Sequence, residues 1–129
     1  MNTLFQLVLA IILSLARYLP QDQAERMAHA ISATAETRQD AAMMLTVSFY
    51  ETGFRSTPGV IPFGLSGAPG ACRVSLLHCA EVSRNSLRRA SFCSTRMERV
   101  FGRYHTGRCA PDPYSIREAR TYQRIYERL

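Results

Sequence analysis

Apolar residues recur along most of this chain every three to four positions, the period of an α-helix with one buried face. Start signals agree with this pattern: Thr37 can cap a helix with Asp40 three residues later, and Ser115 can do so with Glu118. The predicted helices cover residues 21–33, 37–51, 72–79, 80–90, 94–104 and 115–129. The pattern predicts a mainly α domain, and we see no internal repeat in it.

One stretch interrupts the helical pattern. Residues 52–70 contain five glycines and three prolines, a density that marks a long irregular loop. Apolar residues such as Phe54 and Phe63 lie within it, so we expect it to fold against the domain and not to be a disordered linker. Because a loop of this length inside a compact domain is usually functional, it is expected to form one wall of a substrate cleft.

The first 20 residues have two interpretations. Residues 4–15 are nearly all apolar, but this run is shorter than the ~20 residues of an ordinary membrane span. It has the length of a signal-peptide core, and residues 14–16 form a possible cleavage site, although no Lys or Arg precedes the run. The alternative is a first core helix that ends near Pro20. We therefore separate an apolar N-terminal segment, 1–20, from the domain, 21–129, and expect no stable transmembrane anchor.

Arginine supplies all of the basic side chains apart from histidine. The chain has 16 arginines, no lysine and a formal net charge of +6. Eleven of the arginines, against four acidic residues, lie from Arg84 onward. A basic half of this kind favours an anionic partner such as cell-wall polymer, nucleic acid or an acidic membrane surface, or it is simply a solvated face. Charge alone does not choose among these.

Four cysteines, Cys72, Cys79, Cys93 and Cys109, follow the spacing C-x6-C-x13-C-x15-C. Zinc sites usually begin with a close pair of cysteines, so no metal is expected, despite His78 beside Cys79. An even number in a small basic domain fits two disulfides in an oxidising compartment, and four cysteines allow three pairings. Four buried free thiols in a cytosolic protein are the alternative.

Glu51 is the residue that bears most on function. It ends a mostly apolar run, residues 41–50, and Gly53 follows it closely. A carboxyl group among apolar and aromatic neighbours is costly to ionise and can donate a proton near neutral pH. The general acid of a glycosidase needs this property. The plain alternative is an exposed glutamate at a helix end.

Three segments in order resemble the lytic transglycosylase and goose-type lysozyme superfamily. Residues 50–54, Tyr-Glu-Thr-Gly-Phe, are similar to the end of the family's helix, where a catalytic Glu is usually followed by Ser. Residues 64–74 look like the glycine-rich turn that leads into the family's Gly-x-x-Gln helix. Residues 102–109 resemble the later Tyr-Asn-x-Gly segment, whose Tyr lines the cleft. The resemblance covers residues 41–126 and implies a compact, lysozyme-like helical domain.

The resemblance also implies roles for single residues. Glu51 would be the catalytic acid, and the substrate-binding residues would be Thr52, Arg73, Tyr104 and His105. Thr52 stands where Ser is usual and keeps a hydroxyl. Arg73 stands where Gln is usual, and its fixed charge would oppose the general-acid role if it faced Glu51. His105 stands in the Asn position and, unlike Asn, can titrate.

The implied activity is cleavage of peptidoglycan between N-acetylmuramic acid and N-acetylglucosamine, without a cofactor. Glu51 would protonate the glycosidic oxygen and then accept the proton of the sugar's own 6-hydroxyl, which gives a 1,6-anhydro product. A second carboxylate is not expected, because Asp40 lies about three helical turns away and nothing local brings Asp112 to the site. We expect a monomer that acts in the periplasm, outside the cell or in a virion.

Two other functions are compatible with the sequence. A non-catalytic wall-binding or structural module on the same fold would explain Arg73 as a mark of lost activity. A basic helical nucleic-acid binder would use the arginine-rich faces. We find no convincing helix-turn-helix spacing for it, so nucleic acid is not expected as a partner.

Overall fold

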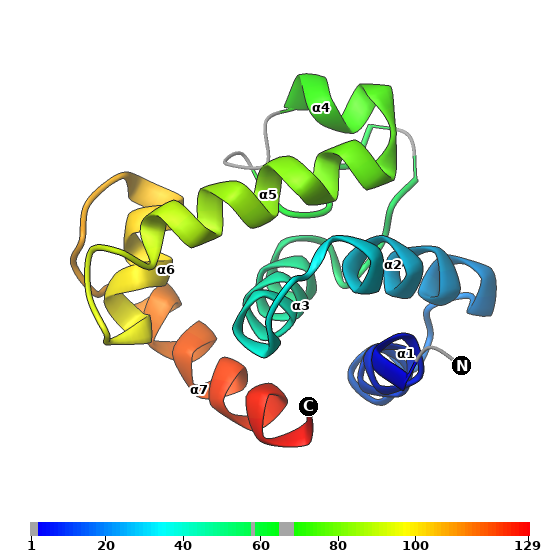
Figure 1. Ribbon diagram of the computed structural model, residues 1–129, viewed down its shortest axis with the longest axis horizontal. Helices are drawn as coiled ribbons and strands as arrows, with labels where there is room; N and C mark the ends of the chain where they lie inside the picture. The colour runs from blue at the N-terminus through cyan, green and yellow to red at the C-terminus, as the bar shows by residue number, and fades with distance from the viewer. Residues whose placement is uncertain (1–2, 58, 65–68) are drawn as a thin grey trace.

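The computed structural model describes residues 3–57, 59–64 and 69–129. Within these residues the chain forms seven helices and no strand (Figure 1), which confirms the predicted mainly α fold. The helices are α1 (Thr3–Leu15), α2 (Gln21–Thr34), α3 (Arg38–Thr52), α4 (Pro69–Val74), α5 (Leu76–Ala90), α6 (Met97–Thr106) and α7 (Pro113–Arg128).

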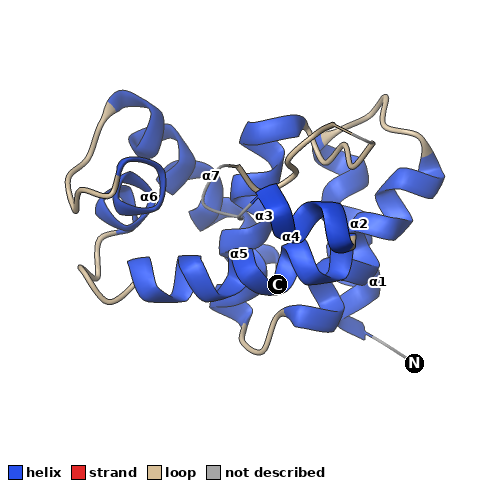
Figure 2. Ribbon diagram, turned by 90° about the horizontal axis from the view of Figure 1, so that it is seen from above, coloured by secondary structure: helices blue, strands red, loops and turns tan. Residues whose placement is uncertain are grey.

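Helix α3 lies at the centre of the domain. It contacts α1, α2, α5 and α7, and Figure 1 shows these helices on different sides of it. Residues 41–48 are buried without a break, as expected for a helix that is covered all round. Seen from above, α6 lies at one end of the molecule and α1 and α2 lie at the other (Figure 2). The buried stretch ends at Ser48, so the last turn of the central helix brings Glu51 out of the core to an exposed position.

Local signals set both ends of α3. The Thr37 Oγ1 accepts a hydrogen bond from the backbone N–H of Asp40 at 3.0 Å, and the Asp40 Oδ2 accepts one from the N–H of Thr37 at 3.2 Å. This is the predicted capping box. The helix ends before Gly53, whose φ of 61° is left-handed and suits glycine. The same glycine that ends the helix thus fixes Glu51 in its last turn.

The start of α7 differs from the prediction. Asp112, and not Ser115, caps the helix: its Oδ1 accepts from the N–H of Ser115 at 2.8 Å, and the Ser115 Oγ accepts from the N–H of Asp112 at 2.8 Å. Pro113 follows in the first turn, where a missing N–H is tolerated. The expected role of Glu118 in a capping box was therefore wrong, and Glu118 is fully buried. Ile116, although apolar, is 39% exposed on the same helix.

Two disulfides connect the helices. Cys72–Cys79 joins α4 to the first turn of α5, and Cys93–Cys109 joins the segment after α5 to the segment after α6. The prediction of two disulfides is confirmed, and the alternative of four free thiols is wrong, because all four cysteines lie in the described residues. Disulfides are typical of proteins outside the reducing cytosol, which is compatible with a secreted or extracellular protein.

The segment between α3 and α4 lies partly outside the described residues. Residues 53–57 and 59–64 form turns and irregular backbone, so the long Gly/Pro-rich loop is not confirmed over its whole length. Phe54 and Phe63 are fully buried, which packs the described part against the domain. At the N-terminus, Val8 and Ile12 of α1 are fully buried in the core. None of the helices in the described ranges is long and apolar enough to cross a membrane.

Candidate functional site

Glu51 meets the loop that follows its own helix. Its side chain is 28% exposed, and its carboxylate lies against the backbone of Gly64. A Cβ added at Gly64 would lie 3.0 Å from the Glu51 Cδ and 3.1 Å from Oε1. Gly64 also has a φ of 84°, a left-handed conformation that strains other residues. Both the close approach and the backbone angle therefore require glycine at this position.

Tyr104 of α6 holds this part of the loop in place. Its hydroxyl donates a hydrogen bond to the Phe63 carbonyl oxygen at 2.6 Å and lies 2.8 Å from the Ser83 Oγ of α5. Burial raises the pKa of Tyr104, and the charges of Glu51 and Glu118 add to this effect, so the hydroxyl remains a donor. Tyr104 is only 4% exposed. It is therefore an aromatic residue of the core, packed behind the loop, and does not lie on an open surface.

His105, the next residue of α6, bridges two carboxylates. Its Nδ1 is 3.5 Å from the Glu51 Oε1. On the other side of the ring, Nε2 is 2.7 Å from Oε1 and 2.9 Å from Oε2 of Glu118. The imidazole of α6 therefore joins the carboxylate at the end of α3 to one in the interior face of α7. The Glu118 contacts are the short ones, as expected for a charge-assisted hydrogen bond.

The His105–Glu118 pair lies out of water. The Glu118 side chain is 0% exposed and that of His105 is 17% exposed. Burial raises the pKa of Glu118, although the hydrogen bond and charge of His105 oppose the rise. Burial alone would lower the pKa of His105, but the hydrogen bond with Glu118 and the charges of Glu118 and Glu51 outweigh it and raise this pKa. The two groups are therefore coupled, and their titration belongs to the pair and not to either residue alone.

Two tyrosines flank the imidazole. The rings of Tyr114 and Tyr104 pack edge-on against His105, with centroids 5.2 and 5.3 Å from that of the imidazole. Burial, together with the charges of Glu51 and Glu118, raises the pKa of Tyr114 to about 12. Tyr114 therefore stays neutral, and its packing restricts rotation of the imidazole.

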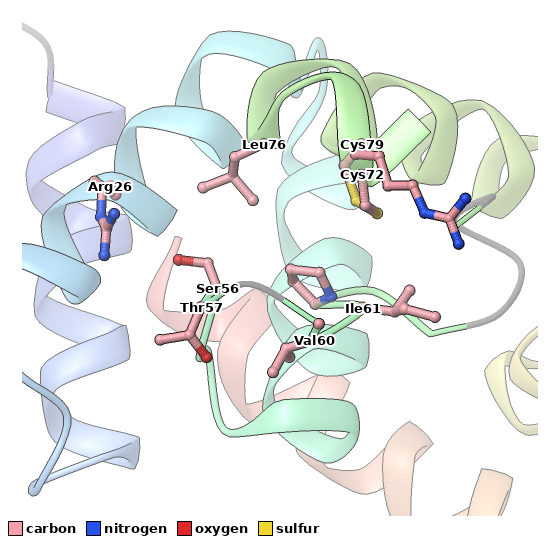
Figure 3. Close-up of a pocket in the computed structure, with 11 residues that line it drawn as sticks. Arg26, Ser56, Thr57, Val60, Ile61, Cys72, Leu76 and Cys79 are labelled. Carbon is pink, nitrogen blue, oxygen red and sulfur yellow. A yellow bond between two sulfur atoms is a disulfide. The ribbon is translucent and has the colours of Figure 1, made fainter. Parts of the chain in front are cut away.

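Thr52 and Arg73 lie away from this cluster. The Thr52 hydroxyl donates to the Arg55 carbonyl oxygen at 3.0 Å and closes the end of α3. Arg73 is exposed in the last turn of α4 and lines a cavity of about 550 Å³ (Figure 3). Among the residues that the structure describes, no ion pair joins Arg73 to Glu51. Of the residues expected to bind substrate, His105 lies within ion-pair distance of Glu51, at 3.5 Å.

Glu118 was not among the residues expected at the site. A signal for it was present: Asp112 with Ser115 three residues later, and Pro113 between them, place the helix start earlier than the Ser115 capping box does. Position 118 falls on the buried face of the helix because it lies three residues after Ser115 and four before Tyr122. The buried residues of α7 are Ser115, Glu118, Tyr122 and Ile125. A glutamate on such a face needs a partner, and His105 is that partner.

Comparisons of the chain with models of protein families, with curated protein sequences and with solved structures found no match. No group of three or more His, Cys, Asp or Glu side chains in the described ranges is arranged to hold a metal ion. The side chains of Glu51, His105 and Glu118 are the titratable groups that the fold brings together at this site.

Proposed function

We propose that this protein cleaves peptidoglycan glycan strands between N-acetylmuramic acid and N-acetylglucosamine by a single-glutamate, lytic transglycosylase mechanism. The observation that carries the proposal is the place of Glu51: a partly exposed carboxylate 3.5 Å from an imidazole whose other nitrogen binds a buried carboxylate. The three segments that resemble the family also support it, because Gly64 and His105 both contact Glu51. The activity would take place in the periplasm, outside the cell or in a virion.

In the first step Glu51 donates its proton to the glycosidic oxygen, and the bond from that oxygen to the muramic acid C1 breaks. A general acid has to hold a proton before it can donate one. Glu118 supports this role because its two short contacts, 2.7 and 2.9 Å, balance the charge of His105. Glu51 lies 3.5 Å from the same ring, so Glu118 offsets charge that the ring would otherwise present to Glu51.

In the second step Glu51, now a carboxylate, acts as the base. The 6-hydroxyl oxygen of the same muramic acid attacks C1, and its proton passes to Glu51. The product is a 1,6-anhydro sugar, no water is consumed, and Glu51 ends protonated as it began. Glu118 is the second carboxylate of the cluster, but it is fully buried behind His105. This burial favours the single-acid scheme over one in which two carboxylates face the sugar.

Tyr104 acts in this proposal as a positioning residue. It holds the Phe63 carbonyl, and the next residue, Gly64, lies against the Glu51 carboxylate. The hydroxyl therefore fixes the distance between loop and acid without touching substrate. Small displacements of a catalytic group are costly, since a reacting atom has to be held within hydrogen-bond reach.

Digestion of purified peptidoglycan tests the function. The wild-type chain should release fragments with 1,6-anhydromuramic ends, which mass spectrometry distinguishes from hydrolysed ends because they lack one water. Glu51→Gln keeps the shape of the side chain and removes the proton, so it should release none while its circular dichroism stays unchanged. Fragments with reducing ends would instead indicate a hydrolase. Undiminished release by the variant, or no release by the wild type, would contradict the proposal.

A further inference from the structure

The connection between α5 and α6 presents an exposed phenylalanine at one end of the molecule. Phe92 is 82% exposed. The connection that carries it lies at the same end as the connection between α6 and α7 (Figure 1), and the Cys93–Cys109 disulfide joins the two. We call residues 89–99 and 107–109 together the α5–α6 tip. Since single exposed apolar residues are common on protein surfaces, the surroundings of Phe92 decide what it can do.

Hydrogen bonds and the disulfide hold the backbone around Phe92. Its N–H donates to the Arg89 carbonyl oxygen at 3.2 Å, and the N–H of Cys93 donates to the Ala90 carbonyl oxygen at 3.1 Å. The disulfide fastens Cys93, the next residue along the chain, to the segment after α6. Because the segment is ordered before a partner arrives, the ring is presented outward and binding does not have to order the backbone.

Arginines flank this phenylalanine in the tip. Arg89, Arg96, Arg99 and Arg108 are all exposed. Between positions 89 and 109 the sequence contains one acidic residue, Glu98, which pairs with Arg96 at 3.4 Å. Among the residues that the structure describes, no ion pair involves Arg89, Arg99 or Arg108. The tip therefore presents an apolar ring together with a net positive charge.

We propose that the α5–α6 tip binds the surface of a bilayer that contains anionic phospholipids. Phe92 enters the boundary between headgroups and acyl chains, where its ring leaves water. The guanidinium groups of the tip stay at the level of the lipid phosphates, which they bind through charge-assisted hydrogen bonds. This inference concerns where the protein is held and not what it cleaves, so it does not rest on the proposed function.

A bilayer fits the tip better than a soluble polyanion does. A polyanion would pair with the arginines and leave the Phe92 ring in water. A single strand of nucleic acid would stack its bases on successive aromatic rings, and in the described part of the chain no ring packs beside Phe92. An anionic bilayer offers phosphates and an apolar layer at the same surface, which matches both features of the tip.

Co-sedimentation with vesicles tests the inference on the full, oxidised chain. The chain should bind vesicles of phosphatidylcholine mixed with phosphatidylglycerol more tightly than vesicles of phosphatidylcholine alone, and added salt should weaken this binding. Phe92→Ala should weaken binding to the anionic vesicles about tenfold, and Arg89→Gln should weaken it about fivefold. Both side chains are exposed, so neither variant should unfold the protein.

Two matched controls remove similar side chains elsewhere. Tyr18→Ala removes an aromatic ring that is 99% exposed between α1 and α2. Arg124→Gln removes one exposed arginine from α7, with the same change in net charge as Arg89→Gln. Neither control should change binding to the anionic vesicles by more than about twofold.

Fluorescence gives a second measurement, because the chain contains no tryptophan. Phe92→Trp places a single reporter in the tip, and its emission should shift to shorter wavelength when anionic vesicles are added, as the indole leaves water. Tyr18→Trp is the matched reporter outside the tip, and its emission should stay unchanged.

Several results would overturn the inference, whether or not the chain cleaves peptidoglycan. Equal binding to the two kinds of vesicle would remove the role of the arginines. Equal losses in Arg89→Gln and Arg124→Gln would show an effect of net charge alone. Undiminished binding by Phe92→Ala, together with displacement of the chain from the vesicles by an oligonucleotide, would make the tip a site for polyanions. An unshifted emission in Phe92→Trp would mean that the ring does not enter the bilayer.

Discussion

His105 and Glu118 form a buried pair across the α6–α7 interface, with Nε2 only 2.7 Å from the Glu118 Oε1. An ionised carboxylate accepts hydrogen bonds, so Glu118 holds the ring proton on Nε2. The opposite nitrogen, Nδ1, then faces Glu51 at 3.5 Å. In the neutral ring this nitrogen accepts a proton, and in the charged ring it donates one. Glu118 of α7 touches no substrate, but by binding Nε2 it thus determines that Nδ1 is the ring nitrogen beside Glu51.

The first prediction concerns Glu118→Gln. The hydrogen bond and charge of Glu118 raise the pKa of His105 against the effect of burial, so this pKa should fall in the variant. The loss of a buried, hydrogen-bonded charge should also reduce the free energy of unfolding by about 1–3 kcal/mol. NMR titration of the imidazole measures the first effect and urea unfolding the second.

Glu127→Gln provides the control for that experiment. Glu127 is on the same helix but exposed, where it accepts a hydrogen bond from Gln123. This variant should leave both the imidazole titration and the stability unchanged. If His105 titrated alike in the wild type and in Glu118→Gln, the pair would not control the proton at the site.

The second prediction is a dependence of stability on pH. The folded-state pKa of His105 is raised above its ordinary 6.5, so the folded state binds a proton that the unfolded state releases. The contribution of this proton to the free energy of unfolding is fully present below pH 6.5, and it is lost as the pH rises through the folded-state pKa of His105. The pKa of Glu118 is also raised, so its contribution to stability likewise decreases as the pH rises above its ordinary 4.5. Stability should therefore fall as the pH rises above 6.5.

Urea unfolding at pH 5, 6, 7 and 8 measures this slope in the wild type and in His105→Gln. The variant lacks the titrating ring, so its stability should decrease less between pH 6 and pH 8. A wild-type stability that increased over the same interval would show that the proton is not held by this pair in the folded state.

Gly64→Ala tests the contact between the loop and the acid. The new Cβ would lie 3.0 Å from the Glu51 Cδ at a φ of 84°, so the carboxylate has to move and the backbone is strained by about 1–2 kcal/mol. Gly59→Ala is a matched control with a φ of 86° and nothing within 4 Å of its Cβ. Both variants should lose similar stability, and only Gly64→Ala should lose peptidoglycan cleavage. Equal activities in the two variants would argue against a role for this contact.

Local patterns predicted most of the fold. The Thr37–Asp40 box and Gly53 bound α3 as expected because capping involves only neighbouring residues. The face of α6 that carries Val100 and Tyr104 is buried, as its periodicity predicts. These signals need no knowledge of the rest of the chain.

The parts that the sequence did not predict depend on packing between distant helices. Two helix-start signals overlap at Asp112 and Ser115. The sequence predicted Glu118 as part of a Ser115 cap, but Asp112 caps the helix and Glu118 lies in the core. Its partner, His105, is on another helix. The resemblance assigned Arg73 to the substrate-binding residues but left open whether it faces Glu51, because a resemblance in sequence order does not fix the direction of a side chain. The structure puts it in the wall of the cavity. The disulfide pairing likewise follows from how α4, α5 and α6 are placed.

The last prediction decides between the two interpretations of the N-terminal segment. Ile12 is 0% exposed in the core, whereas Leu7 on the same helix is 36% exposed. If α1 belongs to the working protein, Ile12→Ala should reduce the free energy of unfolding by about 2–5 kcal/mol, and Leu7→Ala should change it by less than about 1 kcal/mol. Mass spectrometry of the protein recovered from its native compartment should then find residues 3–15 present. A mature chain that begins after Ala16 and unfolds with the same stability as the full chain would mean that α1 is a removable signal segment.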